Sequence, residues 1–209
     1  MASDVDICNL ALVKLGAQPI PSLTSNDPKA AVLNRVYPLL RDKLLRVWRW
    51  NFTRVYTELP ALTDSPPFEY SYAYQLPSDY LRLELADVSD GTSQAVGMPA
   101  ASIGDWNFNR NQDYRIVGRQ IWSNVPPPLR IQYAAQITDP TQFDAAFVES
   151  FACYIAWQLC EQLTGSSQKR QMAQQEYMVS IREARMTNAV ELPPETLPDD
   201  TFMQSRQSS

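Results

Sequence analysis

ICNLALVKLGAQPIPSLTSNDPKAAVLNRVYPLLRDKLLRVWRWNF, residues 7–52, predicts two helices joined by a loop. Apolar residues recur at helical spacing up to Gly16, which is a natural stop for the first helix. Asp27 followed by Pro28 then combines a helix cap with a residue favoured in the first turn. Pro38 lies inside the second helix, where it bends the axis or removes one backbone hydrogen bond. The second helix carries an apolar stripe with a period of about 3.6 residues, made of Leu33, Val36, Tyr37, Leu40, Leu44, Val47 and Trp48.

The chain carries start signals for further helices. Ser3 and Asp6 form a capping pattern before the first helix. Asp139–Pro140 repeats the cap-then-proline signal, and the third helix is expected to span about residues 141–163. Its apolar residues face nearly all directions, so it is either the central helix of a bundle or covered by a neighbouring subunit. A fourth, amphipathic helix is expected over about residues 166–188.

Between residues 52 and 138 the apolar period changes to two, which predicts β-strands. Aromatic and polar residues alternate over 68–76, and leucines alternate with other residues over 81–85. We expect one antiparallel meander of about five or six strands, interrupted by a long loop from Gly91 to Gln112. The remaining strand signals are Tyr114–Val117, Ile121–Trp122 and Leu129–Tyr133.

The element order predicts an α+β fold. We expect a four-helix bundle formed by N- and C-terminal helix pairs, an inserted antiparallel β region and an extended C-terminal tail. The bundle takes residues 1–51 and 139–188, the β subdomain takes 52–138, and the tail takes 189–209. The tail combines prolines, acidic residues and a polar end, a composition that favours extended chain over a packed core.

Composition argues against several classes of function. The net charge of the 209-residue chain is −5, whereas a free-standing nucleic-acid binder usually carries a basic excess. A mildly acidic protein instead suits the lining of a channel through which DNA moves, because its negative charges repel those of the DNA. Histidine is absent, which removes the usual general base and the commonest metal ligand. We therefore expect no enzymatic activity, no metal and no cofactor.

The three cysteines are Cys8, Cys153 and Cys160. Seven residues of helix separate the last two by roughly 10 Å, too far for a disulfide. We expect small buried hydrophobic side chains in a reducing compartment. The first ten residues lack a basic, apolar signal peptide, and no apolar run approaches ~20 residues. We therefore expect assembly in a cytoplasm and no membrane contact.

Residues 29–54 hold seven basic residues and one acidic residue, Asp42, which is a local net charge of +6. Such a segment fits either an acidic partner surface or a solvated helix face paired with acids of the same chain. Arg41, Arg46 and Arg49 are the residues that we expect at a partner or neighbouring-subunit contact. A further possibility is a regulator whose basic helix binds nucleic acid with a steep salt dependence.

Two aromatic clusters admit two interpretations each. Trp48, Trp50 and Phe52 either stack on nucleic-acid bases or fill a core where helix meets sheet, and we favour the core. The tyrosine row is either the inner face of a sheet or an interaction surface, and we slightly favour the interaction surface. This row consists of Tyr70, Tyr72 and Tyr74.

Carboxylates of the β region suggest an alternative function. Two carboxylates at about 5–9 Å hydrolyse a glycosidic bond in many enzymes, so a peptidoglycan hydrolase of a phage tail is the alternative. Surface acids are the simpler interpretation, because no hydrolase motif accompanies them. The acids concerned are Glu58, Asp64, Glu69, Asp79, Glu84 and Asp87.

Four motifs together resemble the head-to-tail adaptor family of short-tailed bacteriophages, the tail tubular protein A type. The first is LGAQPIPSL followed by NDPKAAVLNRVYPLLRDKLLRVWRWNF, and the second is YAYQLPSDYLRLE. The third, YRIVGRQIWSNVPPPLRIQY, is similar to the family's hairpin and proline-rich turn, and FDAAFVESFACYIAWQLCEQLTG resembles its third helix. The resemblance covers most of residues 4–188.

The resemblance implies a structural virion protein. It implies a ring, usually a dodecamer, at the portal vertex of the virion, joining the capsid portal protein to the tail nozzle protein. Double-stranded DNA then passes through the lumen without sequence-specific binding. The helical part faces the portal or neighbouring copies, and the β region meets the nozzle. Some relatives carry cell-wall-degrading activity, which we do not expect here. The tail positions that correspond to portal anchors are Leu192, Pro193, Pro194, Leu197 and Phe202.

Overall fold

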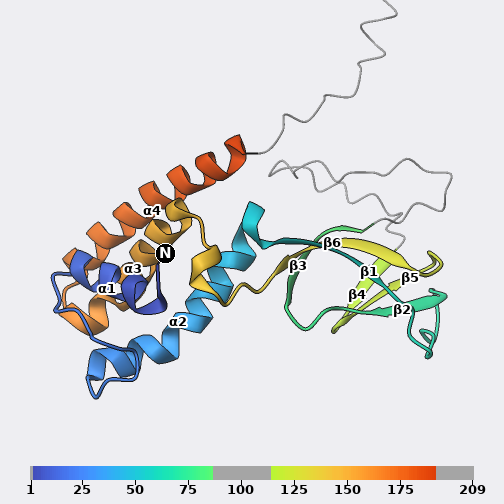
Figure 1. Ribbon diagram of the computed structural model, residues 1–209, viewed down its shortest axis with the longest axis horizontal. Coiled ribbons are helices and arrows are strands. Elements are labelled where there is room, and N and C mark those ends of the chain that lie inside the picture. Colours follow the sequence, from blue (N-terminus) through green and yellow to red (C-terminus); the bar gives the residue numbers. More distant parts are fainter. Residues whose placement is uncertain (1, 87–113, 192–209) are drawn as a thin grey trace, which may run out of the picture.

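The computed structural model describes residues 2–86 and 114–191. Within them the chain forms a mixed α+β structure of four helices and two small antiparallel sheets. The helices lie together at one end and the strands at the other (Figure 1). The C-terminal end of α2 and the start of β1 run from one part into the other, so the two parts meet at this junction. No helix in the described residues has the length and apolarity needed to cross a membrane.

The helices are α1 (Asp4–Lys14), α2 (Pro28–Val47), α3 (Ala145–Thr164) and α4 (Ser167–Val190). The expected start of the third helix at residue 141 is wrong by four residues. Pro140–Gln142 forms a separate 3₁₀ turn, and α3 begins only after Asp144. The fourth helix continues two residues beyond its expected end at 188, into the segment predicted as tail.

The predicted caps of the first two helices are confirmed, whereas Asp139 caps the 3₁₀ turn Pro140–Gln142 and not α3. The Ser3 hydroxyl accepts from the Asp6 amide while the Asp6 carboxylate accepts from the Ser3 amide, which is a complete capping box. Asp27 caps α2 by accepting from the Lys29 amide at 2.8 Å. Gly16 follows α1 with φ of 71°, a left-handed conformation that glycine adopts without steric cost. Local chemistry alone therefore sets the beginnings of α1 and α2.

One hydrophobic core joins all four helices. Helix α3 contacts α1, α2 and α4, and half of its residues are buried, among them Phe147, Phe151 and Ile155. Leu12 from α1, Leu33 from α2 and Ile181 from α4 belong to the same core. Contacts with the other three helices thus cover much of the apolar surface of α3, for which we expected either a central place in a bundle or a neighbouring subunit. Pro38 is exposed on α2, which continues through it to Val47.

The strands form two sheets rather than the single meander that we expected. One sheet has the order β1 (Arg54–Leu59), β6 (Leu129–Ala135), β3 (Tyr80–Ala86). The other has the order β2 (Tyr72–Gln75), β5 (Gln120–Ser123), β4 (Tyr114–Val117). The last of the described strands thus lies between β1 and β3, and Thr57 pairs with Ile131. Alternation within a strand predicts its faces but carries no information about distant partners, so this order could not be deduced from it.

A second core lies between the two sheets. It contains Leu59, Tyr74, Ile121, Leu129 and Ile131, so both sheets contribute to it. A bridge between Ala61 and Tyr74 connects the end of β1 with β2. The predicted loop over 91–112 and nearly all of the predicted tail over 189–209 lie outside the described residues.

Candidate functional site

The junction between the helices and the β region is built by two arginines. Arg46, on the last turn of α2, donates from Nη1 to the Leu81 carbonyl of β3 at 2.8 Å. Arg82 donates back from Nη1 to the Arg46 carbonyl at 2.7 Å and from Nη2 to the Trp48 carbonyl at 3.0 Å. Carbonyls at the C-terminal end of a helix have no donor within the helix, so Arg82 satisfies one in the last turn of α2 and that of the C-cap residue Trp48. The sequence indicated Arg46 as a basic residue of interest but did not indicate Arg82.

A buried carboxylate holds Arg82 in place. Glu84 is 6% exposed and accepts from Arg82 Nη2 at 2.9 Å and from Gln132 Nε2 at 3.2 Å. Arg54 Nε lies 3.4 Å from the same oxygen that accepts from Gln132. A carboxylate buried without a partner is strongly destabilising. Movement of the surrounding arginines away from Glu84 would leave it unpaired, so Glu84 holds them in place. Among the candidate catalytic acids, Glu84 therefore has a structural role in the junction.

Arg41 lies at the same junction, but its side chain is buried. It is 7% exposed, and its Nε donates to Asp42 at 2.9 Å. The other Asp42 oxygen accepts from Gln136 Nε2 at 2.6 Å. Asp42, the single acid of the basic segment, thus links α2 to the chain that follows β6. Of the three arginines expected at a partner contact, Arg41 is buried, Arg49 is half-buried and Arg46 is exposed.

The end of α4 is fixed beside this junction. Asn188 is 7% exposed and donates from Nδ2 to the Arg49 carbonyl at 2.8 Å. Its Oδ1 accepts from the Asn51 amide, and its carbonyl accepts from Asn51 Nδ2, both at 2.8 Å. The sequence provided no signal for this pair, because an asparagine on an amphipathic helix is usually solvated.

The chain leaves the described region at Glu191, whose carboxylate accepts from Asn51 Nδ2 at 3.1 Å. The last described residue therefore lies next to the junction. The five tail positions expected at the portal lie outside the described residues; they are Leu192, Pro193, Pro194, Leu197 and Phe202.

The tryptophan-rich segment fills the core, as we expected. Trp50 is fully buried, donates from Nε1 to the Leu44 carbonyl at 3.1 Å and contacts the Phe147 ring at 5.0 Å between centroids. Phe52 contacts the same ring at 5.1 Å. Trp48 is half-buried, and the Arg185 guanidinium lies 4.5 Å from its ring centroid. These contacts leave no open aromatic platform for base stacking at Trp50.

The tyrosine row is not a single exposed face. Tyr74 is fully buried between the sheets, and its hydroxyl donates to the Val125 carbonyl. Burial raises the pKa of Tyr74 above its ordinary value. Tyr70 and Tyr72 are half-buried. The slight preference for an interaction surface is therefore wrong for Tyr74, because its side chain lies in the core between the two sheets.

A cluster that the sequence did not reveal joins three helices. Lys14 of α1 lies 2.7 Å from Glu149 of α3 and also pairs with Glu176 of α4, beside Cys153. The two glutamates and the cysteine are close enough to hold a metal ion, but the Lys14 ammonium occupies the cationic position among them. Burial lowers the pKa of Lys14, whereas its hydrogen bonds to Glu149 and Glu176 raise it, and the net result is a raised pKa. The cluster therefore functions as an ionic cross-link.

All three cysteines are free and buried, as expected. Burial raises the pKa of the Cys8 thiol to about 12, with a smaller effect of the nearby Asp4 charge. The pKa of Cys153 is raised as well, again chiefly through burial. Raised values disfavour the nucleophilic thiolate, so Cys8 and Cys153 act as apolar filling.

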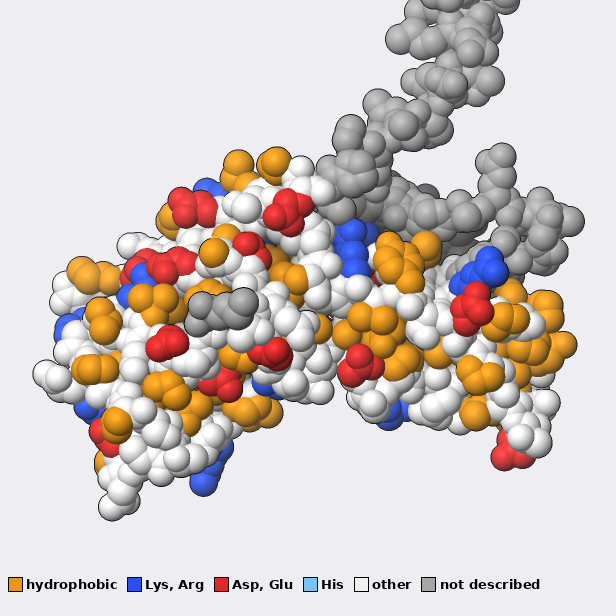
Figure 2. Space-filling view, in the orientation of Figure 1, with side chains coloured by type: hydrophobic (Ala, Val, Ile, Leu, Met, Phe, Trp, Pro, Cys, Tyr) orange, Lys and Arg blue, Asp and Glu red, His pale blue; other side chains and the backbone are white. Residues whose placement is uncertain are grey.

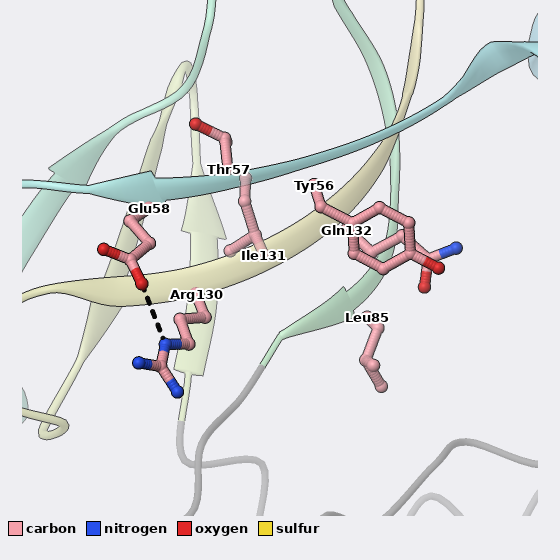
Figure 3. A pocket seen from close by; sticks show the side chains of 7 residues that line it. All are labelled: Tyr56, Thr57, Glu58, Leu85, Arg130, Ile131 and Gln132. Atoms are coloured by element: carbon pink, nitrogen blue, oxygen red, sulfur yellow. Dashed lines mark hydrogen bonds and ion pairs between the residues drawn. The ribbon is translucent and has the colours of Figure 1, made fainter.

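A shallow depression of about 500 Å³ opens on one face of the β1-β6-β3 sheet (Figure 3). Arg130 Nε donates to Glu58 there at 3.0 Å, so their charges neutralise each other. Glu58 is the only carboxylate among its described lining residues, so they provide no carboxylate pair. The lining residues are Tyr56, Thr57, Glu58, Leu85, Arg130, Ile131 and Gln132.

Other acids of the β region also have partners. Asp79 accepts from the Tyr133 hydroxyl at 3.0 Å, and Glu69 pairs with Arg115 at 3.3 Å. Asp64 is exposed, and Asp87 lies outside the described residues. The described acids thus have structural contacts or face solvent, and no observation selects two of them as a catalytic pair.

Comparison with known proteins gives no further indication of function. No protein-family model matches the chain, and no curated protein matches it.

Proposed function

We propose that this protein is a head-to-tail adaptor, a structural virion protein that forms a ring between the capsid portal and the tail nozzle. The observation that carries the proposal is the construction of the junction. Two helix pairs from opposite ends of the sequence share one core, and paired hydrogen bonds of Arg46 and Arg82 hold the β region beside it. The four motifs that resemble the adaptor family are distributed over both parts.

In this proposal the helices form a four-helix bundle that faces the portal or neighbouring copies, and the β region meets the nozzle. An adaptor subunit must hold its two partners at a fixed relative position. Its helical part and its β region must therefore not rotate freely against each other. The hydrogen bonds of Arg82, Glu84 and Asn188 fix both parts to one junction. The tail beyond Glu191 then reaches the portal from this fixed point.

The ring, a dodecamer by the resemblance, surrounds double-stranded DNA without sequence-specific contacts. The net charge of −5 agrees with a lumen that does not retain DNA. The role requires neither a catalytic residue nor a cofactor, because binding and coupled ordering of the tail supply the free energy of assembly.

The proposal is tested by mixing the full chain with the portal protein of the same virion and imaging the particles in negative stain. We expect a ring of this protein attached to one end of the portal. A chain lacking residues 192–209 should attach more weakly, whereas Phe68→Ala, at an exposed position in the β region, should not affect portal binding. A chain that remains solitary in the presence of the portal and in assembled particles would refute the proposal.

A further inference from the structure

Two exposed stripes on different helices of the chain have complementary patterns. On the solvent side of α2, every fourth residue from 35 to 47 alternates between a basic and an apolar side chain. We call these residues the α2 stripe: Arg35, Leu39, Lys43 and Val47. Leu39 and Val47 are each more than half exposed, at 68% and 55%, and both basic residues are exposed. Residues four apart lie on one face of a helix, so the four side chains form a continuous row.

Helix α4 carries a stripe in which apolar residues are interspersed with acidic ones. Its residues are spaced alternately four and three apart, which keeps them on one face of the helix. All of its apolar members are more than half exposed, and both glutamates are exposed. We call these residues the α4 stripe: Met172, Glu176, Val179, Glu183, Met186 and Val190. Figure 2 shows hydrophobic and acidic side chains interspersed along the upper edge of the helical part, where Figure 1 places α4.

The spacing of the two stripes matches. Arg35 and Lys43 are eight residues apart, which is about 12 Å along a helix, and Glu176 and Glu183 are seven apart, which is about 10.5 Å. Leu39 and Val47 have the same separation as the basic pair, and the apolar residues of α4 recur every seven residues from 172 to 186. Two helices laid side by side therefore place apolar residues on apolar residues and basic residues on acidic ones.

The two stripes do not cover each other within one molecule. Helices α2 and α4 both pack on α3, and in Figure 1 they border opposite edges of the helical part. Their apolar residues are exposed, so within residues 2–86 and 114–191 of a single copy nothing covers either stripe. Two complementary patches on different faces of one molecule favour a contact in which one face of each copy binds the other face of the next copy. Such a contact closes into a ring when the rotation between successive copies divides a full turn.

We propose that the α2 stripe of one copy binds the α4 stripe of the next copy. This assignment rests on the proposed ring and names the surfaces that join its subunits. Leu39 and Val47 supply the apolar contacts, and Lys43 and Arg35 pair with Glu183 and Glu176 of the neighbouring copy. Lys14 already binds one oxygen of Glu176, so Glu183 is the cleaner partner for a test. Lys43 is an exposed residue whose ammonium lies 5.7 Å from the Tyr154 ring centroid.

The first test is trans cross-linking in the full chain. A Leu39→Cys chain is mixed with a Val179→Cys or a Met186→Cys chain under mild oxidation, so that a disulfide between the new cysteines forms only between copies. The native cysteines are buried and provide a low background. We expect a covalent dimer in one or both mixtures, and none when each variant is mixed with the unmodified chain.

The second test is charge reversal, read by sedimentation velocity of the free chain and by imaging with the portal. Lys43→Glu and Glu183→Lys should each lower the association constant roughly tenfold or more, and the two single variants mixed together should recover part of it. Arg130→Glu gives the same charge change as Lys43→Glu at an exposed position in the β region and should have little effect.

The possible outcomes separate the two proposals. The stripe assignment would be overturned if both charge-reversal variants formed normal rings and the cysteine variants gave no cross-link. The proposed adaptor function would not be affected by that result. A chain that associates neither alone nor on the portal would overturn both proposals. Cross-linking together with recovery by the mixed reversals would support the assignment.

Discussion

Arg46 and Arg82 exchange hydrogen bonds across the junction between helix α2 and strand β3. The Arg46 side chain donates to the carbonyl of the residue before Arg82, and the Arg82 side chain donates to the carbonyl of Arg46. Each arginine thus binds backbone of the opposite element. A hinge at this point would require both contacts to break, so the relative position of the two parts depends on a few identifiable side chains.

Arg82→Ala should destabilise the chain by about 2–4 kcal/mol, because it removes the donors to Arg46 and Trp48 and a partner of buried Glu84. The free energy of unfolding, from urea titration followed by circular dichroism, measures this change. Arg130→Ala removes an exposed pair with Glu58 and should cost less than about 1 kcal/mol. Equal losses in the two variants would contradict a structural role of Arg82 in the junction.

Asn188→Ala should lower the free energy of unfolding by about 2–3 kcal/mol, because the Asn51 amide and the Arg49 carbonyl lose a buried partner. Hydrogen exchange of the amides near the end of α4 should accelerate as well. The neighbouring Thr187 is exposed, and Thr187→Ala should change stability by less than about 0.5 kcal/mol. Unchanged exchange in Asn188→Ala would show that this asparagine does not anchor the helix.

Lys14→Met should destabilise the chain at pH 8 by roughly 1–3 kcal/mol, because Glu149 and Glu176 lose their shared cation. The pKa of Lys14 is raised in the folded chain, so the folded state keeps its proton at higher pH than the unfolded state does. This stabilisation is complete below the unfolded-state pKa of about 10.5 and is lost as pH rises through the folded-state pKa.

The difference between wild type and Lys14→Met should therefore shrink above pH 10.5. Urea unfolding at a series of pH values between about 8 and 11.5 measures it. Lys169→Met, at an exposed lysine of α4, should show only a small difference. A constant difference for Lys14→Met over this range would count against the ionic cross-link.

Phe147→Ala should cost about 3–5 kcal/mol, because the ring is fully buried against Trp50, Phe52 and Phe151 and its removal leaves a cavity. Thermal unfolding with intrinsic tryptophan fluorescence would report both the loss of stability and any change around Trp50. Phe68→Ala, at a position that is 62% exposed, should stay within about 0.5 kcal/mol of wild type. A similar melting temperature for the two variants would contradict the central place of Phe147 in the core.

The candidate sites were only partly predictable. Arg41, Arg46 and Arg49 stand out as basic residues, but their sequence does not indicate that Arg41 is buried against Asp42 while Arg46 binds β3. Asn51 and Asn188 are 137 residues apart and carry no motif, so their pairing becomes visible only in three dimensions. The same holds for Lys14, Glu149 and Glu176, each of which alone is an ordinary charged residue on a helix.

The sequence by itself determined the features that depend on neighbours along the chain. Capping at Ser3 and Asp27, the four apolar periodicities and the alternation of the strands rest on local hydrogen bonds and on the helical and extended repeats. Only the tertiary structure decided that β6 lies between β1 and β3, that the strands divide into two sheets, and that Tyr74 faces inward. The physical reason is that strand pairing and burial between distant segments depend on the packing of the whole chain, and local pattern specifies a face but not the partner that covers it.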